Sequence, residues 1–182
     1  MNQKKPISSA ILNWYDENAR NLPWRIPPKK SIQGIKPEPY NAWLSEIMLQ
    51  QTTVSAVIPY YLDFLARWPT IGTLAETSEQ EVMGAWAGLG YYTRARNLIQ
   101  CARLVVDNYN SIFPTEWNEL IKLPGIGPYT AAAIQAIAFN KKSVVVDGNI
   151  ERIIVRLFGI IEPIKSSKNL ITAYARKMTP EK

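Results

Sequence analysis

The sequence predicts an all-α protein. Apolar residues recur at helical spacing along most of the 182 residues, and only the short run at 143–146 could be extended. No internal repeat is visible. An apolar fraction of 47% with six Trp indicates a folded chain, long enough for one domain or two small lobes.

The first half of the chain is predicted to form helices around one proline-rich loop. The stretch ISSAILNWYDENAR, at 7–20, is the first helix. Residues 26–39 hold four of the thirteen prolines and predict an exposed loop. The next helix carries Glu46 and should end or kink at Pro59, after which helix continues over 60–68.

The second half contains clearer helix boundaries. Ser78 with Glu81 resembles a capping box and opens a helix that stops at Gly88. The longest predicted helix covers 93–109. Later helix starts are marked by a capping residue or by a proline in the first turn: Thr115, Pro128 and Asp147.

Charge and missing residue types narrow the function. The net charge of +6 and the pI near 9.4 suit a polyanionic partner such as nucleic acid, although a mildly basic enzyme would look the same. We find no signal peptide and no apolar run long enough to span a membrane, so a cytoplasmic location is expected. The chain has no His and one Cys, which excludes Ser-His-Asp and Cys-His nucleophiles, His-containing zinc sites and a cluster held by four thiolates. Cys101 has apolar neighbours at helical spacing and is interpreted as a core residue.

LPGIGPYTAAAI, at 123–134, joins two predicted helices through a glycine-rich turn. Gly125 and Gly127 permit a backbone that directs N–H groups outward beside a helix N-terminus, an arrangement that binds phosphate. The alternative is a tight corner between two helices, which the residues PGIG (124–127) would fit equally well. The full pattern, with Thr130 and an apolar helix after it, indicates a helix–hairpin–helix DNA-binding motif.

Two carboxylates lie in contrasting surroundings. Glu46 lies in a nearly all-apolar helix, where burial disfavours the charged form and favours a protonated acid. Asp147 comes just before the predicted helix that contains NIERII, and we interpret it as the N-cap of that helix. At this position the helix dipole stabilises the carboxylate anion. Such a pair suits glycosidic cleavage, in which one group donates a proton and the other stabilises a cationic sugar.

Five blocks of the sequence resemble one known family. They are LPWR (22–25), PYNAWLSEIMLQQT (39–52), GLGYYTRARNL (88–98), LPGIGPYTAAAI (123–134) and VDGNIERII (146–154). In this order they resemble the MutY-type adenine DNA glycosylases of the endonuclease III-like helix–hairpin–helix superfamily. The likeness runs from about residue 8 to 178. Bifunctional endonuclease III-like glycosylase/lyases are the less probable match, because they carry a Lys where this chain has Tyr129.

The resemblance implies catalytic roles for four residues. Glu46 would protonate adenine at N7 and later help to position water. Asp147 would stabilise the oxocarbenium-like sugar or bond to it transiently. Tyr129 and Asn149 would support the two carboxylates by hydrogen bonds, with ordinary packing at a helix start as the alternative.

The resemblance also implies DNA contacts. Flipping adenine out of the duplex requires groups that fill the gap. The candidates are Leu49, Gln50, Gln51 and Tyr91; packing between helices is the alternative for at least one of Tyr91 and Tyr92. The hairpin would contribute Gly125, Gly127 and Thr130. Arg25, Arg94 and Arg96 would either contact phosphates or lie on a solvated face.

The family pattern divides the chain into three parts. Residues 1–35 would contribute to a second helical lobe, 36–145 would form the helical bundle with the hairpin motif at 116–138, and 146–182 would supply a partial C-terminal share of that lobe. Family members continue into four Cys that hold a [4Fe-4S] cluster, and usually into a NUDIX-like domain that helps to recognise 8-oxoguanine. This chain holds neither, so an incomplete second lobe and no bound cofactor or metal are expected. The chain is then either a piece of a longer protein or a shortened product.

We therefore predict a monofunctional adenine DNA glycosylase of base excision repair. It would be a bacterial monomer that hydrolyses the N-glycosidic bond of adenine opposite 8-oxoguanine or guanine in double-stranded DNA. The alternative of a different class is a non-catalytic DNA-binding remnant, which keeps the hairpin without the chemistry. Glu46→Gln separates the two, because it should abolish excision in an enzyme and barely affect a simple binder.

Overall fold

The computed structural model describes residues 7–180, which form eleven helices and no strand. The all-α class is therefore confirmed, and the run at 143–146 has no regular secondary structure. None of the helices within the described range is long and apolar enough to cross a bilayer.

The N-terminal helices agree with the sequence except at one break. Helix α1 spans Ile7–Asn18, and a short α2, Pro28–Ile32, lies inside the predicted loop. The helix predicted to reach Pro59 is two helices, α3 (Pro39–Leu49) and α4 (Val54–Arg67), so that expectation is wrong. Thr53 caps α4 by accepting a hydrogen bond from the Ala56 N–H, and Pro59 lies inside α4.

The remaining helices begin close to their predicted starts. Ser78 and Glu81 form the expected capping box, and Asp147 is the expected N-cap. Thr115 is not a cap, because the residue before the helix is Glu116. The helices are α5 (Ile71–Glu76), α6 (Glu79–Ala85), α7 (Thr93–Tyr109), α8 (Trp117–Leu120), α9 (Pro128–Phe139), α10 (Gly148–Phe158) and α11 (Lys168–Met178).

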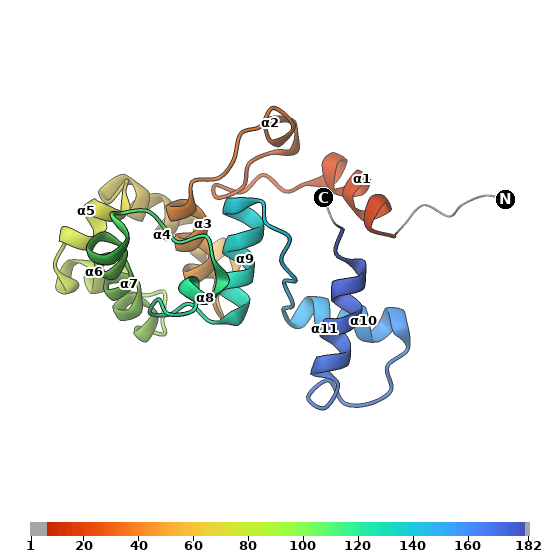
Figure 1. Cartoon of the computed structure of the whole chain (residues 1–182). Coiled ribbons are helices and arrows are strands. Elements are labelled where there is room, and N and C mark those ends of the chain that lie inside the picture. Colours follow the sequence, from red (N-terminus) through yellow and green to blue (C-terminus); the bar gives the residue numbers. More distant parts are fainter. Residues whose placement is uncertain (1–6, 181–182) are drawn as a thin grey trace.

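Helix α3 is the central element of the large bundle (Figure 1), packing against α4, α7 and α9. Trp43 and Leu44 are completely buried, and the Trp43 ring lies 5.3 Å from that of Phe113, centroid to centroid. The buried apolar side chains from Leu22 to Ala138 form one continuous cluster. Glu46 is therefore carried by the most enclosed helix of the protein.

A second, smaller cluster lies in the α10–α11 pair, which Figure 1 shows apart from the bundle beyond the 140–147 segment. Its buried members are Ile154, Ile171 and Ala175. Side chains of α1, including Ile11 and Leu12, line an apolar groove together with α10 and α11. The two ends of the described chain thus meet beside this small core.

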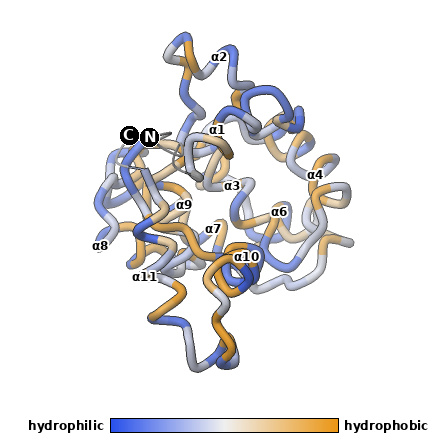
Figure 2. The backbone as a smooth tube through the Cα atoms, turned by 90° about the vertical axis from the view of Figure 1, so that its right-hand side faces the viewer, coloured by the Kyte–Doolittle hydropathy of each residue, from blue (hydrophilic) through white to orange (hydrophobic). Residues whose placement is uncertain are grey.

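The segment that carries α2 projects from the body (Figures 1 and 2). No residue of α2 is buried, and Ile32 is 80% exposed. In Figure 2 hydrophilic residues alternate with hydrophobic ones along this segment. Prolines at 27 and 28 open α2, and the segment makes little contribution to the core.

Candidate active site

Three parts of the chain meet around one cavity of about 610 Å³. Helix α3 contributes Glu46, the first turn of α9 contributes Tyr129, and the start of α10 contributes Asp147 and Asn149. All four residues predicted to be catalytic therefore line the same space. The remaining lining residues are Tyr15, Arg20, Leu22, Trp24, Arg25, Ile26, Ser31, Pro37, Ser45, Leu49, Val54, Ala136, Ile137 and Asn140.

Glu46 is mostly enclosed, in the last turn but one of α3. Burial raises the pKa of its carboxyl, and the nearby charge of Asp147 acts in the same direction. A hydrogen bond from the Tyr129 hydroxyl and the charge of Arg25 lower this pKa without reversing the shift. Glu46 thus holds a proton at a higher pH than an exposed glutamate does, as a general acid requires.

Tyr129 lies in the first turn of α9, near enough to both carboxylates to be affected by their charges. Burial, followed by the charges of Glu46 and Asp147, raises the pKa of its hydroxyl to about 12. The phenol is therefore neutral at physiological pH and can donate a hydrogen bond to a carboxylate. It cannot supply the amine that a Schiff base requires.

Asp147 is fixed by the start of α10. Its Oδ1 accepts hydrogen bonds from the backbone N–H of Asn149 at 3.0 Å and of Ile150 at 2.7 Å, and its Oδ2 accepts one from the Asn149 amide at 3.0 Å. The Asn149 Oδ1 accepts in turn from Arg152. Asn149 and the first backbone N–H groups of α10 therefore hold the carboxylate in place.

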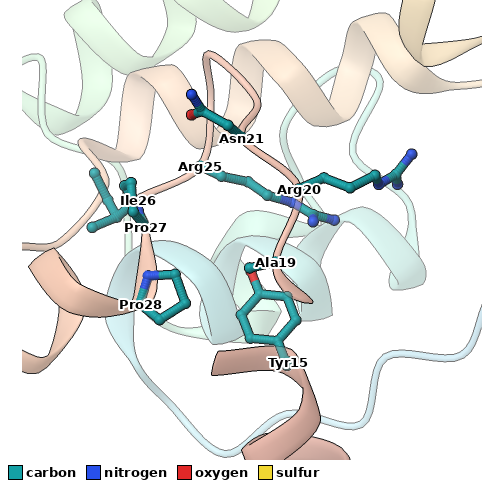
Figure 3. A pocket seen from close by; sticks show the side chains of 8 residues that line it. All are labelled: Tyr15, Ala19, Arg20, Asn21, Arg25, Ile26, Pro27 and Pro28. Atoms are coloured by element: carbon teal, nitrogen blue, oxygen red, sulfur yellow. The ribbon is translucent and has the colours of Figure 1, made fainter. Parts of the chain in front are cut away.

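Arg25 lines the rim shared by this cavity and a smaller one of about 230 Å³ (Figure 3). Its guanidinium carbon lies 5.9 Å from the centre of the Tyr15 ring. Arg20 and Asn21 line the smaller cavity from the same segment. Tyr15, Arg20 and Trp24 were not predicted to lie at the site. The aromatic and basic residues in and before LPWR (22–25) are the sequence signal that could have predicted them.

The hairpin turn joins α8 to α9 next to the end of α3. Gly125 has φ +77°, a backbone conformation that favours glycine, and a Cβ at this position would make a tight contact of 3.0 Å with the Asn97 Cβ. Gly127 has φ −89° and is exposed, immediately before α9. Thr130 is only 3% exposed, and its hydroxyl accepts a hydrogen bond from Gln50.

The predicted DNA-contact residues on α3 and after it divide into two groups. Leu49 lines the large cavity, and the Gln50 amide donates to the Gly125 carbonyl at 3.4 Å and to the Thr130 hydroxyl at 3.3 Å. Gln50 therefore ties the end of α3 to the hairpin. Gln51 is exposed instead and adopts φ +55°, a conformation that costs a non-glycine residue about 1–3 kcal/mol.

Tyr91 lies on a second exposed turn, between α6 and α7. It is 61% exposed with φ +49°, and the neighbouring Tyr92 is 41% exposed. The expectation that one tyrosine of the pair packs between helices is therefore wrong. The Tyr91 ring lies against Arg94, whose guanidinium carbon is 5.4 Å from the ring centre.

The structure contradicts both positions predicted for Arg94, a phosphate contact and a solvated face. Its side chain is 8% exposed, and its guanidinium donates to backbone carbonyls at the end of α3 and in the turn before α7. A guanidinium enclosed in this way is neither solvated nor aimed at a DNA phosphate. Arg96, by contrast, is exposed and forms a 3.7 Å salt bridge with Glu79.

The residues of this chain do not fit an iron–sulfur cluster. Cys101 is the only cysteine, and it is completely buried in the bundle core on α7, as predicted. Within residues 7–180 no group of three or more His, Cys, Asp or Glu side chains is placed to hold a metal ion. The polar groups that line the large cavity include carboxylates, phenols, amides and guanidinium groups.

Residues 44–180 match the model of the HhH-GPD superfamily base excision DNA repair proteins. The chain belongs to this superfamily. The adenine DNA glycosylase of Buchnera aphidicola subsp. Baizongia pistaciae is 44% identical over 172 residues, which cover 94% of this chain and 46% of that protein. The adenine DNA glycosylase of Homo sapiens is 44% identical over 152 residues, or 83% of this chain and 28% of that protein. The chain thus spans less than half the length of these curated relatives.

Solved structures show the same fold. A thermostable thymine-DNA glycosylase superposes with a TM-score of 0.80 at 27% identity, covering 96% of this chain and 77% of that one. Endonuclease III in a trapped covalent intermediate with DNA superposes with a TM-score of 0.74 at 20% identity, covering 96% and 76%. The endonuclease III-like fold predicted from the sequence is confirmed.

Proposed function

We propose that this chain is the catalytic core of a monofunctional adenine DNA glycosylase, acting on adenine opposite 8-oxoguanine or guanine. The observation that supports it best is the cluster of Glu46, Tyr129 and Asp147 on one cavity, with a raised pKa on Glu46 and a phenol at the position of the lyase amine. The adenine DNA glycosylases at 44% identity support the choice of base.

The two carboxylates divide the reaction between them. Glu46 gives its proton to N7 of the flipped adenine, and the bond from C1′ to N9 then breaks with its electron pair going to the base. Asp147 stabilises the positive charge that develops on the sugar, held in place by its bonds from Asn149 and Ile150. Water adds at C1′, and its proton returns to Glu46, leaving free adenine and an abasic site.

Tyr129 and Arg25 adjust the acid. The Tyr129 hydroxyl donates a hydrogen bond to the Glu46 carboxylate, and Arg25 adds a positive charge at the wall of the same cavity. Both interactions oppose the effect of burial on the Glu46 pKa. The acid is therefore protonated more often than an exposed glutamate, yet not so strongly that it cannot release its proton.

DNA would approach along the surface that carries the hairpin, Gln51 and Tyr91. The Gly125 turn presents backbone next to the N-terminus of α9, which suits a phosphate. Gln51 and Tyr91 are exposed side chains available to fill the space of a flipped base. The net charge of +6 favours the approach of the duplex.

The deciding experiment is single-turnover release of adenine from an 8-oxoguanine:adenine duplex, comparing the chain with Glu46→Gln. We expect an abasic product that is cut only after alkali, with the rate falling about 10²–10⁴-fold in the variant because a general acid contributes that much. Strand cleavage without alkali would contradict a monofunctional enzyme.

A non-catalytic DNA-binding remnant is the second candidate. It is favoured by the hairpin turn beside the N-terminus of α9 and by the net charge of +6, which support DNA binding without any chemistry. Failure to release adenine, from a chain that is folded and binds the duplex, would leave this second candidate and rule out the first.

A further inference from the structure

Arg94 is a buried cation paired with no carboxylate among the described residues. It lies in the first turn of α7, 8% exposed, between the rings of Trp86 and Tyr91 at 5.2 and 5.4 Å from its guanidinium carbon. The four salt bridges within residues 7–180 do not involve it. Its Nε has no hydrogen-bond partner, so the buried guanidinium depends on the acceptors that its two Nη atoms find.

Those acceptors are five backbone carbonyls on two separate segments. The Nη1 atom donates to carbonyls at the end of α3: Ile47 at 3.3 Å, Met48 at 2.7 Å and Gln50 at 2.6 Å. The Nη2 atom donates to the turn before α7: Leu89 at 3.1 Å and Gly90 at 3.1 Å. One planar side chain thus joins residues 47–50 to residues 89–90, two segments that are distant in the sequence.

Each segment continues directly into an exposed residue with a left-handed backbone. Gln51, with φ +55°, follows the Gln50 carbonyl, and Tyr91, with φ +49°, follows the Gly90 carbonyl. This conformation is uncommon for residues other than glycine, asparagine and aspartate, and it persists where the surroundings enforce it. Arg94 binds the carbonyl immediately before each of the two residues.

We propose that Arg94 is a positioning residue that holds Gln51 and Tyr91 together as one unit for insertion into the DNA duplex. It acts through the backbone of both turns and, for Tyr91, through direct contact with the ring. This inference rests on the proposed function, because it assumes that the chain opens a base pair. It adds that the two inserting residues depend on one side chain that does not itself touch DNA.

A lysine cannot replace this arrangement. Its single ammonium has three donors on a flexible stem, whereas the guanidinium reaches both carbonyl groups from a fixed plane and stacks on two rings. Arg103 on the same helix provides a matched control, since its guanidinium also donates to backbone carbonyls, of Ala75 at 3.2 Å and Thr77 at 3.0 Å. Those carbonyls lie at α5, away from both inserting residues.

The test measures base unstacking apart from chemistry. Glu46→Gln protein is titrated with a guanine:adenine duplex carrying the fluorescent base 2-aminopurine beside the adenine, with Arg94→Lys or Arg103→Lys added. We expect Arg94→Lys to lose the fluorescence increase while keeping its affinity for an unmodified duplex, and Arg103→Lys to keep both. In the chain with Glu46 intact, Arg94→Lys should lower the single-turnover rate by about 10²-fold, the loss expected from a small misplacement.

The inference is overturned if Arg94→Lys retains full unstacking, or if it loses unstacking and general DNA affinity in equal proportion, as a merely structural role predicts. Arg94→Gln provides a second, neutral variant that leaves no buried charge without partners. Adenine release by the unaltered chain with no effect of Arg94→Lys would leave the proposed function intact and remove only the role of Arg94. If unstacking depends on Arg94 but the unaltered chain releases no adenine, the role of Arg94 is supported and the proposed function is contradicted.

If neither variant folds, amide hydrogen exchange on the unaltered chain decides the question. Residues 50–52 and 89–91 should open with the same free energy, because one side chain closes both. Independent opening of the two turns, with clearly different free energies, would overturn the proposal.

Discussion

The two carboxylates of the candidate site belong to regions of very different size. Glu46 is carried by α3, inside a cluster of buried side chains that extends from Leu22 to Ala138. Asp147 opens α10, whose cluster contains only three buried residues, all on α10 and α11. One carboxylate of the candidate site therefore rests on a large core and the other on a small one. The comparison implies that activity can be lost through the small region while the large one remains folded.

The largest expected effect comes from Asp147→Asn. Asparagine is as good an N-cap as aspartate, so the bonds from the N–H groups of Asn149 and Ile150 are kept and α10 persists. The negative charge is lost, and with it the stabilisation of the cationic sugar. We expect adenine release to fall by about 10³-fold in single-turnover assays, as when one preorganised electrostatic group is removed.

Circular dichroism and thermal melting provide the control for this variant. Helix content and melting temperature should match those of the unaltered chain within error. A variant that excises adenine at the original rate would show that the Asp147 charge has no part in the reaction, and a large fall in stability would show that its main role is to cap α10.

The second prediction compares the two cores directly. Leu44→Ala removes a completely buried side chain of the bundle, and Ile171→Ala removes one from the small cluster. Each deletion costs about 2–5 kcal/mol of stability where it acts. We expect Leu44→Ala to lower the denaturant midpoint of the whole bundle, and Ile171→Ala to lower protection from hydrogen exchange in residues 144–178 alone.

Adenine release should be reduced in both variants, but for different reasons. In Ile171→Ala the bundle should keep its protection while Asp147 loses its fixed position. Equal loss of exchange protection in both regions of Ile171→Ala would show that the protein unfolds as a single unit and would remove the comparison.

The helix boundary that sequence reasoning missed lies at residues 50–53, between α3 and α4. The all-α class, α7, α9 and the Asp147 cap were predicted because each has a local signal: a periodic apolar stripe, a proline in the first turn or a capping carboxylate. The break after α3 has no glycine or proline, and the nearest proline, Pro59, lies inside α4. The break has one local signal that was not used, the N-cap Thr53 of α4. It is also held by Arg94, which is far away in the sequence.

Arg94 itself had a signal that was not used. It precedes Leu98, Cys101 and Val105 by four, seven and eleven residues, so it lies on the same buried face of α7 as those side chains. A cation on an apolar stripe needs internal acceptors, which predicts a structural contact rather than a solvated one. The four candidate catalytic residues, each of which belongs to a local sequence pattern, line one cavity, and their roles remain predictions.

The third prediction concerns the hairpin, which belongs to the bundle. Gly125→Ala would force a side chain into a backbone with φ +77° and bring its Cβ to 3.0 Å from that of Asn97. We expect a loss of about 1–3 kcal/mol in stability together with weaker binding to any duplex, measured by denaturant titration and by fluorescence anisotropy.

Gly127→Ala is the matched control, because its φ is −89° and a Cβ there would meet open space. It should change stability by less than about 0.5 kcal/mol, as an unstrained surface substitution does. Similar losses of stability in both variants would mean that backbone strain at Gly125 is not the reason why the turn excludes side chains.

The smallest effect should be the pH dependence of stability in Glu46→Gln. Burial raises the Glu46 pKa above the ordinary 4.5, so the folded state binds this proton more tightly than the unfolded state does. Below the ordinary value both states are protonated and the carboxyl carries no penalty. As the pH rises through the raised pKa, the folded protein must bury a charge and loses stability. Glutamine avoids this loss, so its advantage should be absent in acid, grow above about pH 4.5 and then level off.

Urea unfolding at a series of pH values measures this difference, with Glu162→Gln as the control because Glu162 is exposed. A Glu46→Gln advantage that shrinks as the pH rises would mean that the folded protein stabilises the Glu46 anion. Glu46 would then be unsuited to act as the acid, and the proton for adenine N7 would have to come from another group on the cavity wall.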